Sequence, residues 1–493
     1  MKINFQAYGF VAFSGLRPPI LQSKTSHNSR RKEAFETKAM VINMQKTVTS
    51  TAASDAQNRE KFNSKEYRRS ANGYTFECMF EYFISILVSG QFLTVLLKYI
   101  GVPDSLNGVI QSIISLAFLF QIFSVFVLHK ISNTKRFAVL FHTTSQLFFV
   151  TLFLIPFFPI ADNVKHILAV ICPLVAYFGN YFVTSVIYRW GNSFVEPHHR
   201  GRFCARKEMI SLMSGMVLTL AMGYAIDSFE ASDNLRGGFI LLALSILVFC
   251  ISDFVCLMII KNDKKPRDER AKAHESLPLR DIMKNTLGNK SFRSTVVVAT
   301  LWRAGVFFTY GFMGTYMDNS HELNFSVGTV QLITLFALFV RFLVAIPIGK
   351  YADKTSYARA MRVGLCIASC AFLVNIFTTP SDFARYLVIP YLVLYNASLS
   401  CIDSNLLNLP YSYVDEKYFI HASAIKNSIS GLGGFLASLL AGALLGYIQG
   451  NGNTLFGFHV YGQQVLSVIS FIIMMISVFY TKFVIEKQKI MIQ

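Results

Sequence analysis

Apolar stretches long enough to cross a lipid bilayer recur twelve times along this 493-residue chain. A helix needs about 20 predominantly apolar residues to span a hydrocarbon layer of about 30 Å. Only 15% of the residues are charged, which is too few to cover the surface of a water-soluble protein of this length. Because exposed backbone polar groups cannot face lipid, we expect each stretch to form a helix. The expected spans are 76–99, 105–128, 136–160, 164–188, 207–227, 236–260, 293–317, 324–348, 358–378, 383–408, 420–446 and 461–483.

The net charge of +18 is concentrated on one side of the predicted membrane. Residues 1–75 contain 13 Lys and Arg and residues 261–293 contain 10, whereas all six loops of the opposite side, counted with the adjoining span ends, contain four. Basic residues accumulate on the cytoplasmic side of membrane proteins. We therefore expect a multi-pass protein of the cell membrane with both termini in the cytoplasm. This topology explains the positive charge without a nucleic-acid partner.

The distribution of apolar and polar segments divides the chain into five parts. Residues 1–75 are polar and basic and are predicted to form a disordered cytoplasmic tail. Residues 76–260 form a first six-helix bundle, 261–292 a cytoplasmic linker and 293–484 a second six-helix bundle. Residues 485–493 form a short cytoplasmic tail.

The two predicted bundles share an internal repeat. The stretch SFVEPHHRGRFCARKEMISLMSG (193–215) aligns without a gap with SYVDEKYFIHASAIKNSISGLGG (412–434), which lies 219 residues later. Gly108 in the second span corresponds to Gly328 in the eighth at nearly the same offset. Two parallel six-helix repeats are typical of one class of secondary transporter.

Two loop motifs in this repeat resemble those of the major facilitator superfamily. The loop between the eighth and ninth spans matches the family pattern G-x-x-x-D-[RK] at Gly349, Asp353 and Lys354, with Arg359 following. The equivalent loop of the first half, 125–137, keeps basic residues but lacks the glycine and the acid. The resemblance implies an all-α membrane protein with 12 transmembrane helices arranged as two pseudo-symmetric bundles.

The loop between the fourth and fifth spans resembles a further family motif, P-x-x-x-R-G-[RK], at 197–202, where it is one residue shorter. The resemblance implies that the eighth-to-ninth loop packs on the start of the fifth span, so we expect Asp353 to pair with Arg206 or Lys207. The alternative is that the basic residues only determine topology. The expected cytoplasmic gate comprises Arg200, Arg202, Arg206, Lys207, Gly349, Asp353, Lys354 and Arg359.

Several ionisable and polar groups lie within the expected spans, where burial is costly and function is the default hypothesis. Glu81 and Arg303 occupy corresponding first spans of the two halves, so they are predicted to form a cross-cavity ion pair, or Arg303 binds an anionic substrate. Asp403 either binds a proton or cation during transport or pairs with Arg341 or Lys426. Asp253 is interpreted as structural. The candidate cavity residues are Glu81, Gln91, Tyr177, Asn180, Tyr181, Arg303, Tyr395, Asn396 and Asp403.

These observations predict secondary active transport of a small solute by alternating access, coupled to a proton or cation or operating as an uncoupled facilitator. A membrane sensor built on the same scaffold is the alternative. The sequence shows no phosphate-binding glycine loop, zinc-type His pair or G-x-S-x-G nucleophile motif, so we expect no enzyme activity, cofactor or metal site. The expected partners are the solute, the coupling ion and the lipid bilayer.

Overall fold

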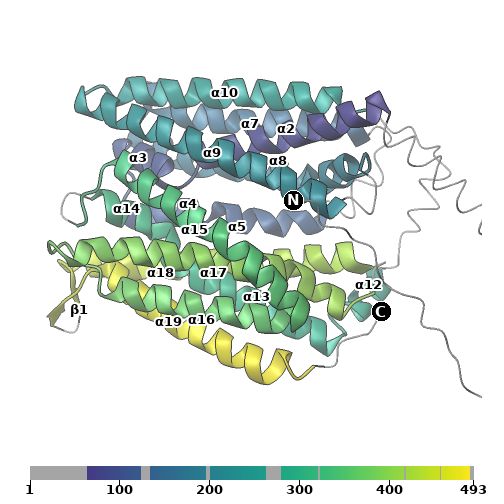
Figure 1. Cartoon of the computed structure of the whole chain (residues 1–493). Helices are drawn as coiled ribbons and strands as arrows, with labels where there is room; N and C mark the ends of the chain where they lie inside the picture. The colour runs from purple at the N-terminus through teal and green to yellow at the C-terminus, as the bar shows by residue number, and fades with distance from the viewer. Residues whose placement is uncertain are drawn as a thin grey trace, which may run out of the picture. The chain divides into compact units, whose positions relative to one another are not determined.

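The computed structural model (Figure 1) describes residues 64–123, 134–195, 200–261, 279–319, 322–415, 418–455 and 457–488. These residues belong to one compact unit that begins at Ser64. The expected tail before residue 64, most of the expected linker (262–278) and the last residues (489–493) lie outside the described ranges.

The segments up to residue 261 contain the helices of the expected first half. Breaks in the backbone hydrogen-bond pattern divide some spans into shorter helical segments. Their bounds are α2 (Lys65–Leu87), α3 (Gly90–Tyr99), α4 (Asp104–Gln111), α5 (Ile113–Ala117), η1 (Phe118–Phe120), α7 (Thr134–Leu154), η3 (Ile155–Phe157), α8 (Asp162–Asn192), α9 (Arg200–Ala231) and α10 (Leu235–Ile259).

The segments after the expected linker contain the second set of helices and one small hairpin. Their bounds are α12 (Leu279–Asn285), α13 (Lys290–Thr309), η5 (Tyr310–Phe312), α14 (Met313–Asp318), α15 (Val327–Lys354), α16 (Tyr357–Ile376), η6 (Ala384–Leu387), α17 (Val388–Asn408), η7 (Leu409–Ser412), α18 (Phe419–Gly450), β1 (Thr454–Leu455), β2 (Phe458–His459), α19 (Gly462–Tyr480) and η9 (Thr481–Ile485).

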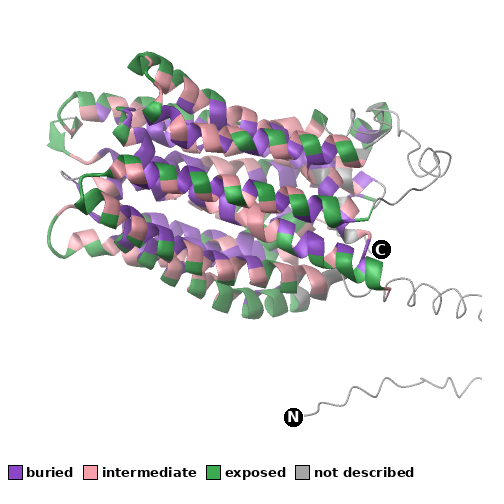
Figure 2. Cartoon of the chain, turned by 90° about the horizontal axis from the view of Figure 1, so that it is seen from above, coloured by how far each residue is buried: buried purple, intermediate pink, exposed green. Residues whose placement is uncertain are grey.

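The described helices confirm the predicted all-α membrane fold. Eleven of them are long and apolar enough to cross a membrane, and α2 with α3 forms a twelfth span bent by 41°. Exposed apolar side chains recur at helical spacing along α10, as Leu244, Val248, Ile251 and Val255. Such a stripe is expected on a helix that faces lipid rather than water. Figure 2 shows the interleaving of buried and exposed positions along the helices.

The first span of each half is broken near its middle. Gly90 adopts a φ of 58°, a left-handed conformation that glycine tolerates and that ends α2 and begins α3. Its freed backbone N–H donates a hydrogen bond to Gln111 Oε1 at 3.1 Å. The corresponding span of the second half passes from α13 through η5 to α14 around Tyr310.

The structure differs from the sequence analysis at two places, and one expectation about the ends of the spans is wrong. The first helix begins at Lys65 and not at 76, because Ser64 caps it by accepting a hydrogen bond from the Tyr67 N–H, and helix formation outside lipid does not require an apolar stripe. The second difference is the antiparallel pair β1–β2 after α18, where Gly457 takes a φ of 82° between the strands. The first turns of α2 are polar, so hydropathy alone does not define where this helix begins.

The bundle has two ends that are used below as landmarks (Figure 1). The hairpin end carries β1–β2 and the end of α14 at Asp318, and the linker end carries the start of α2 and α12. Helices α2, α7, α8, α9 and α10 lie together in the upper part of the figure, whereas α13, α16, α17, α18 and α19 lie together in the lower part. The helices up to residue 261, including α3, α4, α5 and η1, are called the first group, and those from residue 279 on, including α14 and α15, the second group. Contacts between these two groups run chiefly through α4, α5 and η1 against α18, and through α9 against α15.

Candidate functional site

Arg303 on α13 contacts the first group of helices through an aromatic ring. Its guanidinium carbon lies 4.7 Å from the centre of the Phe118 ring, and the Phe118 ring lies 4.5 Å from the ring of Tyr181 on α8. Among the described residues, none forms a hydrogen bond or ion pair with the Arg303 guanidinium that would occupy its donors. A guanidinium carries five N–H donors in a fixed plane, a geometry suited to carboxylate and phosphate groups. Arg303 and Tyr181 therefore lie together between the two groups of helices.

The predicted ion pair between Glu81 and Arg303 is not formed in this structure. Glu81 Oε1 accepts a hydrogen bond from Asn180 Nδ2 at 2.9 Å, and Asn180 Oδ1 accepts one from the Thr184 hydroxyl at 3.0 Å. Glu81 is therefore held inside the first group of helices, whereas Arg303 packs on Phe118. The other interpretation of Arg303, as a ligand for an anionic substrate, stays a prediction.

Tyr395 and Asn396 lie in the interior of the second group of helices. The Tyr395 ring stacks on Tyr310 at 4.7 Å and on Tyr391 at 6.1 Å, and it is buried. Asn396 is also buried and donates a hydrogen bond to the Leu392 carbonyl of its own helix. Tyr310 is partly exposed, so this aromatic stack reaches from the interior to the surface.

Asp403 pairs with Arg341, one of the alternatives that the sequence leaves open. Arg341 Nη2 lies 3.4 Å from Asp403 Oδ2, and the two side chains are 33% and 46% exposed. Lys426, the other considered partner, is buried and donates a hydrogen bond to the Leu406 carbonyl. The structural role of Asp403 therefore has a geometric basis, while its role in ion coupling stays a prediction.

Two other candidate cavity residues have structural contacts. Gln91 Nε2 donates a hydrogen bond to Asp318 Oδ1 at 3.0 Å, which links α3 to α14. The buried Tyr177 ring packs against Phe149 on α7 with centroids 4.9 Å apart. Both residues therefore make contacts between helices in this structure.

The hairpin end carries charged links between the two groups of helices. Lys98 pairs with the same Asp318 carboxylate that accepts from Gln91. Asp227 on α9 accepts a hydrogen bond from the Gly328 N–H of α15 at 2.9 Å. Because a carboxylate at a helix N-terminus is favoured by the helix dipole, this second link is stronger than a neutral contact.

Glu322 lies beside these links, in the loop between α14 and α15. Its side chain is buried, and its Oε2 has no hydrogen-bond partner among the described residues. Burial, followed by the nearby Asp104 carboxylate, raises the pKa of Glu322 to about 8. The hairpin end therefore contains an acid that titrates near neutral pH.

The expected cytoplasmic gate is described only in part. The side chains of Arg200, Arg202 and Asp353 lie outside the described residues. Lys207 does not face the second group of helices: its Nζ donates to Cys78 Sγ at 3.1 Å and lies 4.6 Å from the centre of the Tyr74 ring. The predicted pairing of Asp353 with Lys207 is thus not supported in this conformation, because Lys207 is held by α2.

The remaining gate residues are exposed at the linker end. Arg206 is exposed near the start of α9, and Lys354 is exposed at the end of α15. Gly349 has open space around it, and the Arg359 N–H donates to the Ser356 hydroxyl that caps α16. The pairing of Asp353 with Arg206 stays a prediction.

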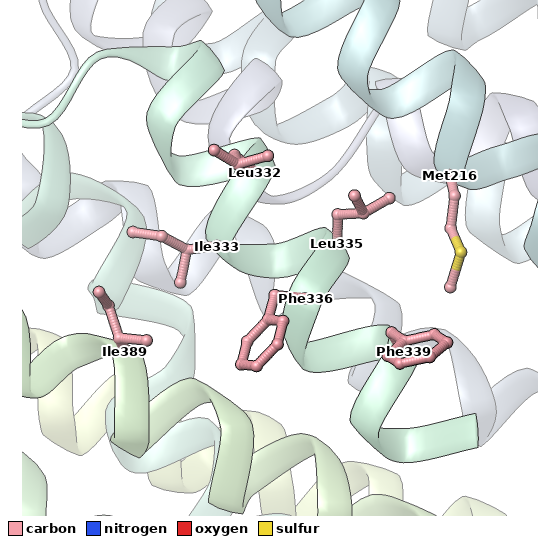
Figure 3. Close-up of a pocket in the computed structure, with 7 residues that line it drawn as sticks. All are labelled: Met216, Leu332, Ile333, Leu335, Phe336, Phe339 and Ile389. Carbon is pink, nitrogen blue, oxygen red and sulfur yellow. The ribbon is translucent and has the colours of Figure 1, made fainter. Parts of the chain in front are cut away.

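An apolar hollow of about 510 Å³ lies between α9, α15 and α17 (Figure 3). Met216 of α9 lies opposite Leu335 and Phe339 of α15, and no polar side chain lines the hollow. It offers no donor or acceptor to a polar solute. Arg303, with Phe118 and Tyr181 beside it, is therefore the better candidate for binding a polar solute.

Sequence reasoning missed His142. This residue lies on α7, is 1% exposed, and approaches the buried carboxylates of Glu77 and Asp253. A single His within an apolar run carries no spacing signal, and its acidic neighbours lie on helices remote in sequence. The sequence predicts no metal site, yet these three side chains are close enough to bind an ion together.

Comparisons with known proteins agree with this architecture. No curated protein matches the sequence significantly. The nucleoside transporter NupG superposes with a TM-score of 0.61 at 11% identity, covering 86% of this chain and 100% of that protein. An auto-inhibited POT family peptide transporter gives 0.57 at 10% identity over 85% and 97% of the two chains. A bacterial homologue of the human lysosomal transporter Spinster, inward-facing and unoccupied, gives 0.55 at 14% identity over 85% and 96%.

Identities this low establish the fold and carry no information on the solute. The sequence model of the Major Facilitator Superfamily matches residues 71–438, which is most of the chain and includes both predicted bundles up to the eleventh span. The protein therefore belongs to the Major Facilitator Superfamily and is a multi-pass membrane transporter.

Proposed function

We propose that this protein is a secondary active transporter that moves a small anionic solute by alternating access. In this proposal residues 76–260 and 293–484 tilt against each other. The protein lies in the cell membrane, and its linker end faces the cytoplasm. The basic loops predicted at the linker end support this orientation.

Arg303 is the observation that carries the proposal. It lies between the two groups of helices, with its donors unoccupied by described residues and its flat face on Phe118. A charged group within a membrane span is energetically costly, so such a group is by default a candidate for a functional role. An anionic group on the solute would satisfy the guanidinium, and the neighbouring Tyr181 ring would contact the body of the solute.

The uneven distribution of charged links supports the alternating-access step. Asp318 and Asp227 link the two groups of helices at the hairpin end. At the linker end, the links between described residues are neutral, such as Asn427 to Gln121 at 3.0 Å. We infer that the hairpin end is closed in this conformation, and that Asp353 with Arg206 closes the linker end in the alternate one.

Uptake into proteoliposomes tests the function. A panel of sugars, amino acids, nucleosides and organic anions is offered with and without a pH gradient, and we expect saturable uptake of an anionic member. Arg303→Ala should reduce kcat/KM by roughly 10- to 100-fold, because a hydrogen bond to a charged group contributes about 1.5–3 kcal/mol. Arg293→Ala is the matched control, since Arg293 lies on the same helix and is exposed at its start.

A second comparison addresses the gate. Asp353→Lys should impair uptake, and Arg206→Glu in the same protein should restore part of it. Failure of this rescue would remove the gate pair while leaving the Arg303 site intact. Absence of flux for every solute, combined with specific ligand binding, would instead favour the sensor alternative.

A further inference from the structure

We infer that Glu77, His142 and Asp253 form a binding site for one divalent transition-metal ion inside the first group of helices. Each of the three offers a ligand atom, and these atoms all lie within 4.8 Å of one another. The residues come from α2, α7 and α10, so an ion bound there would join three helices. The site is separate from Arg303 and goes beyond the proposed transport function.

The burial of this cluster creates the need for a cation. Glu77 and His142 are 1% exposed and Asp253 is 0% exposed. The cluster holds two carboxyl groups and one imidazole, which offsets at most one negative charge, and an uncompensated carboxylate is costly in a membrane interior. Lys207 lines the same small cavity as Glu77 and His142, but its ammonium group is bonded to Cys78 and Tyr74. A divalent cation would neutralise both carboxylates.

Polar atoms without partners provide a second, independent observation. Asp253 Oδ1, His142 Nδ1 and Gln146 Oε1 lack a hydrogen-bond partner among the described residues, whereas Asp253 Oδ2 is paired with His142 Nε2. Buried polar atoms in native proteins are nearly always satisfied by protein, water or an ion. Three unsatisfied atoms on three adjacent side chains therefore point to a missing ligand.

The spacing of the donors suits a metal ion. His142 Nε2 lies 3.1 Å from Asp253 Oδ2. Two ligands at about 2.0–2.2 Å from one ion stand about 3 Å apart when the angle between them is near 90–100°. Gln146 Nε2 lies 2.8 Å from His142 Nε2, and turning the amide over would present its oxygen as a fourth ligand.

The chemistry of the donors selects the class of metal. Carboxylate and amide oxygens with one imidazole suit Zn²⁺, Mn²⁺ or Fe²⁺, whereas soft copper(I) prefers sulfur ligands. Cys78 Sγ donates to Glu77 Oε2 at 3.1 Å, so it supports the carboxylate and is not counted as a ligand. A cavity of about 110 Å³ reaches Glu77 and His142 past Glu81 and provides a route of entry.

Metal binding by the purified full-length protein tests this inference. Protein freed of any affinity tag is stripped with a chelator in detergent, and Mn²⁺ or Zn²⁺ alone is titrated with calorimetry and elemental analysis. We expect one tightly bound equivalent and a higher Tm in the loaded protein. His142→Ala and Asp253→Asn should each weaken binding by at least about 100-fold, since loss of a mere supporting partner already costs about 10–100-fold.

Two controls keep the test decisive. Glu486→Gln removes the acid of another ion pair and should leave the bound equivalent intact. X-ray absorption of the loaded wild-type protein should show nitrogen and oxygen ligands at about 2.0–2.2 Å and no sulfur, and it needs no variant to fold. A wild-type protein that binds no equivalent, or a sulfur ligand, would overturn the site. Because no flux is measured, either result is independent of the transport proposal.

Discussion

The third and sixth spans are joined by a charged pair in each half of the bundle, but the two pairs differ in their surroundings. In the first half His142 on α7 approaches Asp253 on α10 at 3.1 Å, with both side chains fully buried. In the second half Arg362 on α16 pairs with Glu486 just after η9, also at 3.1 Å, with side chains 28% and 14% exposed. The two halves thus place a charged contact at equivalent helices.

The difference lies in how the charge is compensated. Arg362 and Glu486 neutralise each other near the end of their helices. His142 and Asp253 have Glu77 beside them, so the first-half cluster holds an additional acid and unsatisfied oxygens. Duplication of the fold therefore preserves where a contact is made, while the chemistry at that contact has diverged. The first half holds a site that can take an ion, and the second half contributes the unoccupied Arg303.

The largest expected effect separates the two pairs directly. Asp253→Asn should lower the free energy of unfolding by about 3–5 kcal/mol, because it breaks a buried charged cluster and leaves its partners uncompensated. Glu486→Gln should cost less than about 1 kcal/mol, since its pair is partly hydrated. Thermal unfolding of the two variants in detergent measures the comparison. Equal losses would show that burial does not distinguish the pairs.

An intermediate effect is expected where the two halves touch. A Cβ atom added at Gly108 of α4 would lie 2.2 Å from Phe312 Cδ1, whereas one added at Gly349 of α15 would meet nothing. Gly108→Ala should therefore destabilise the protein by about 1–3 kcal/mol, and Gly349→Ala should change stability by less than about 1 kcal/mol. Thermal unfolding of the two variants provides the test. An unchanged Tm in the Gly108→Ala variant would contradict the close packing between the halves.

The smallest expected effect concerns pH at the hairpin end. Because burial raises the pKa of Glu322 to about 8, its protonated form is favoured in the folded protein. Its contribution to stability is complete below the ordinary pKa of about 4.5 and is lost as the pH rises through 8. Glu322→Gln should therefore be close to the wild type in stability near pH 5 and more stable than the wild type near pH 9. The exposed acid Asp382 provides the control, since Asp382→Asn should leave the pH profile of the Tm unchanged.

The sequence predicts the membrane helices well because each is long enough to be defined by its own apolar residues. The start of α2 at Lys65 escapes this reasoning, since its first turns are polar and are fixed by the Ser64 cap and an ion pair between Glu66 and Lys261. The tertiary partner Lys261 is 195 residues away. Helix boundaries that depend on such contacts cannot be derived from hydropathy.

The candidate site divides in the same way. The depth of Arg303 follows from its position in an apolar span, and the structure places it between the two groups of helices. Its contact with Phe118 depends on how spans two and seven pack, which no local pattern encodes. For Asp403 the sequence leaves two partners, and only the packing of α15 on α17 selects Arg341.

Spin-label distances across both ends of the bundle test the central claim that the two halves tilt against each other. One label pair joins Ser232 to Asn451 at the hairpin end, and the other joins Arg69 to Lys354 at the linker end, all of which are exposed. The exposed native thiols of α16 are replaced beforehand.

The decisive comparison uses Asp318→Asn, which removes the ion pair with Lys98, against the exposed control Asp382→Asn. The account predicts that Asp318→Asn lengthens the hairpin-end distance and shortens the linker-end distance, while the control changes neither. Two distances that stay fixed, or that lengthen together, would contradict it.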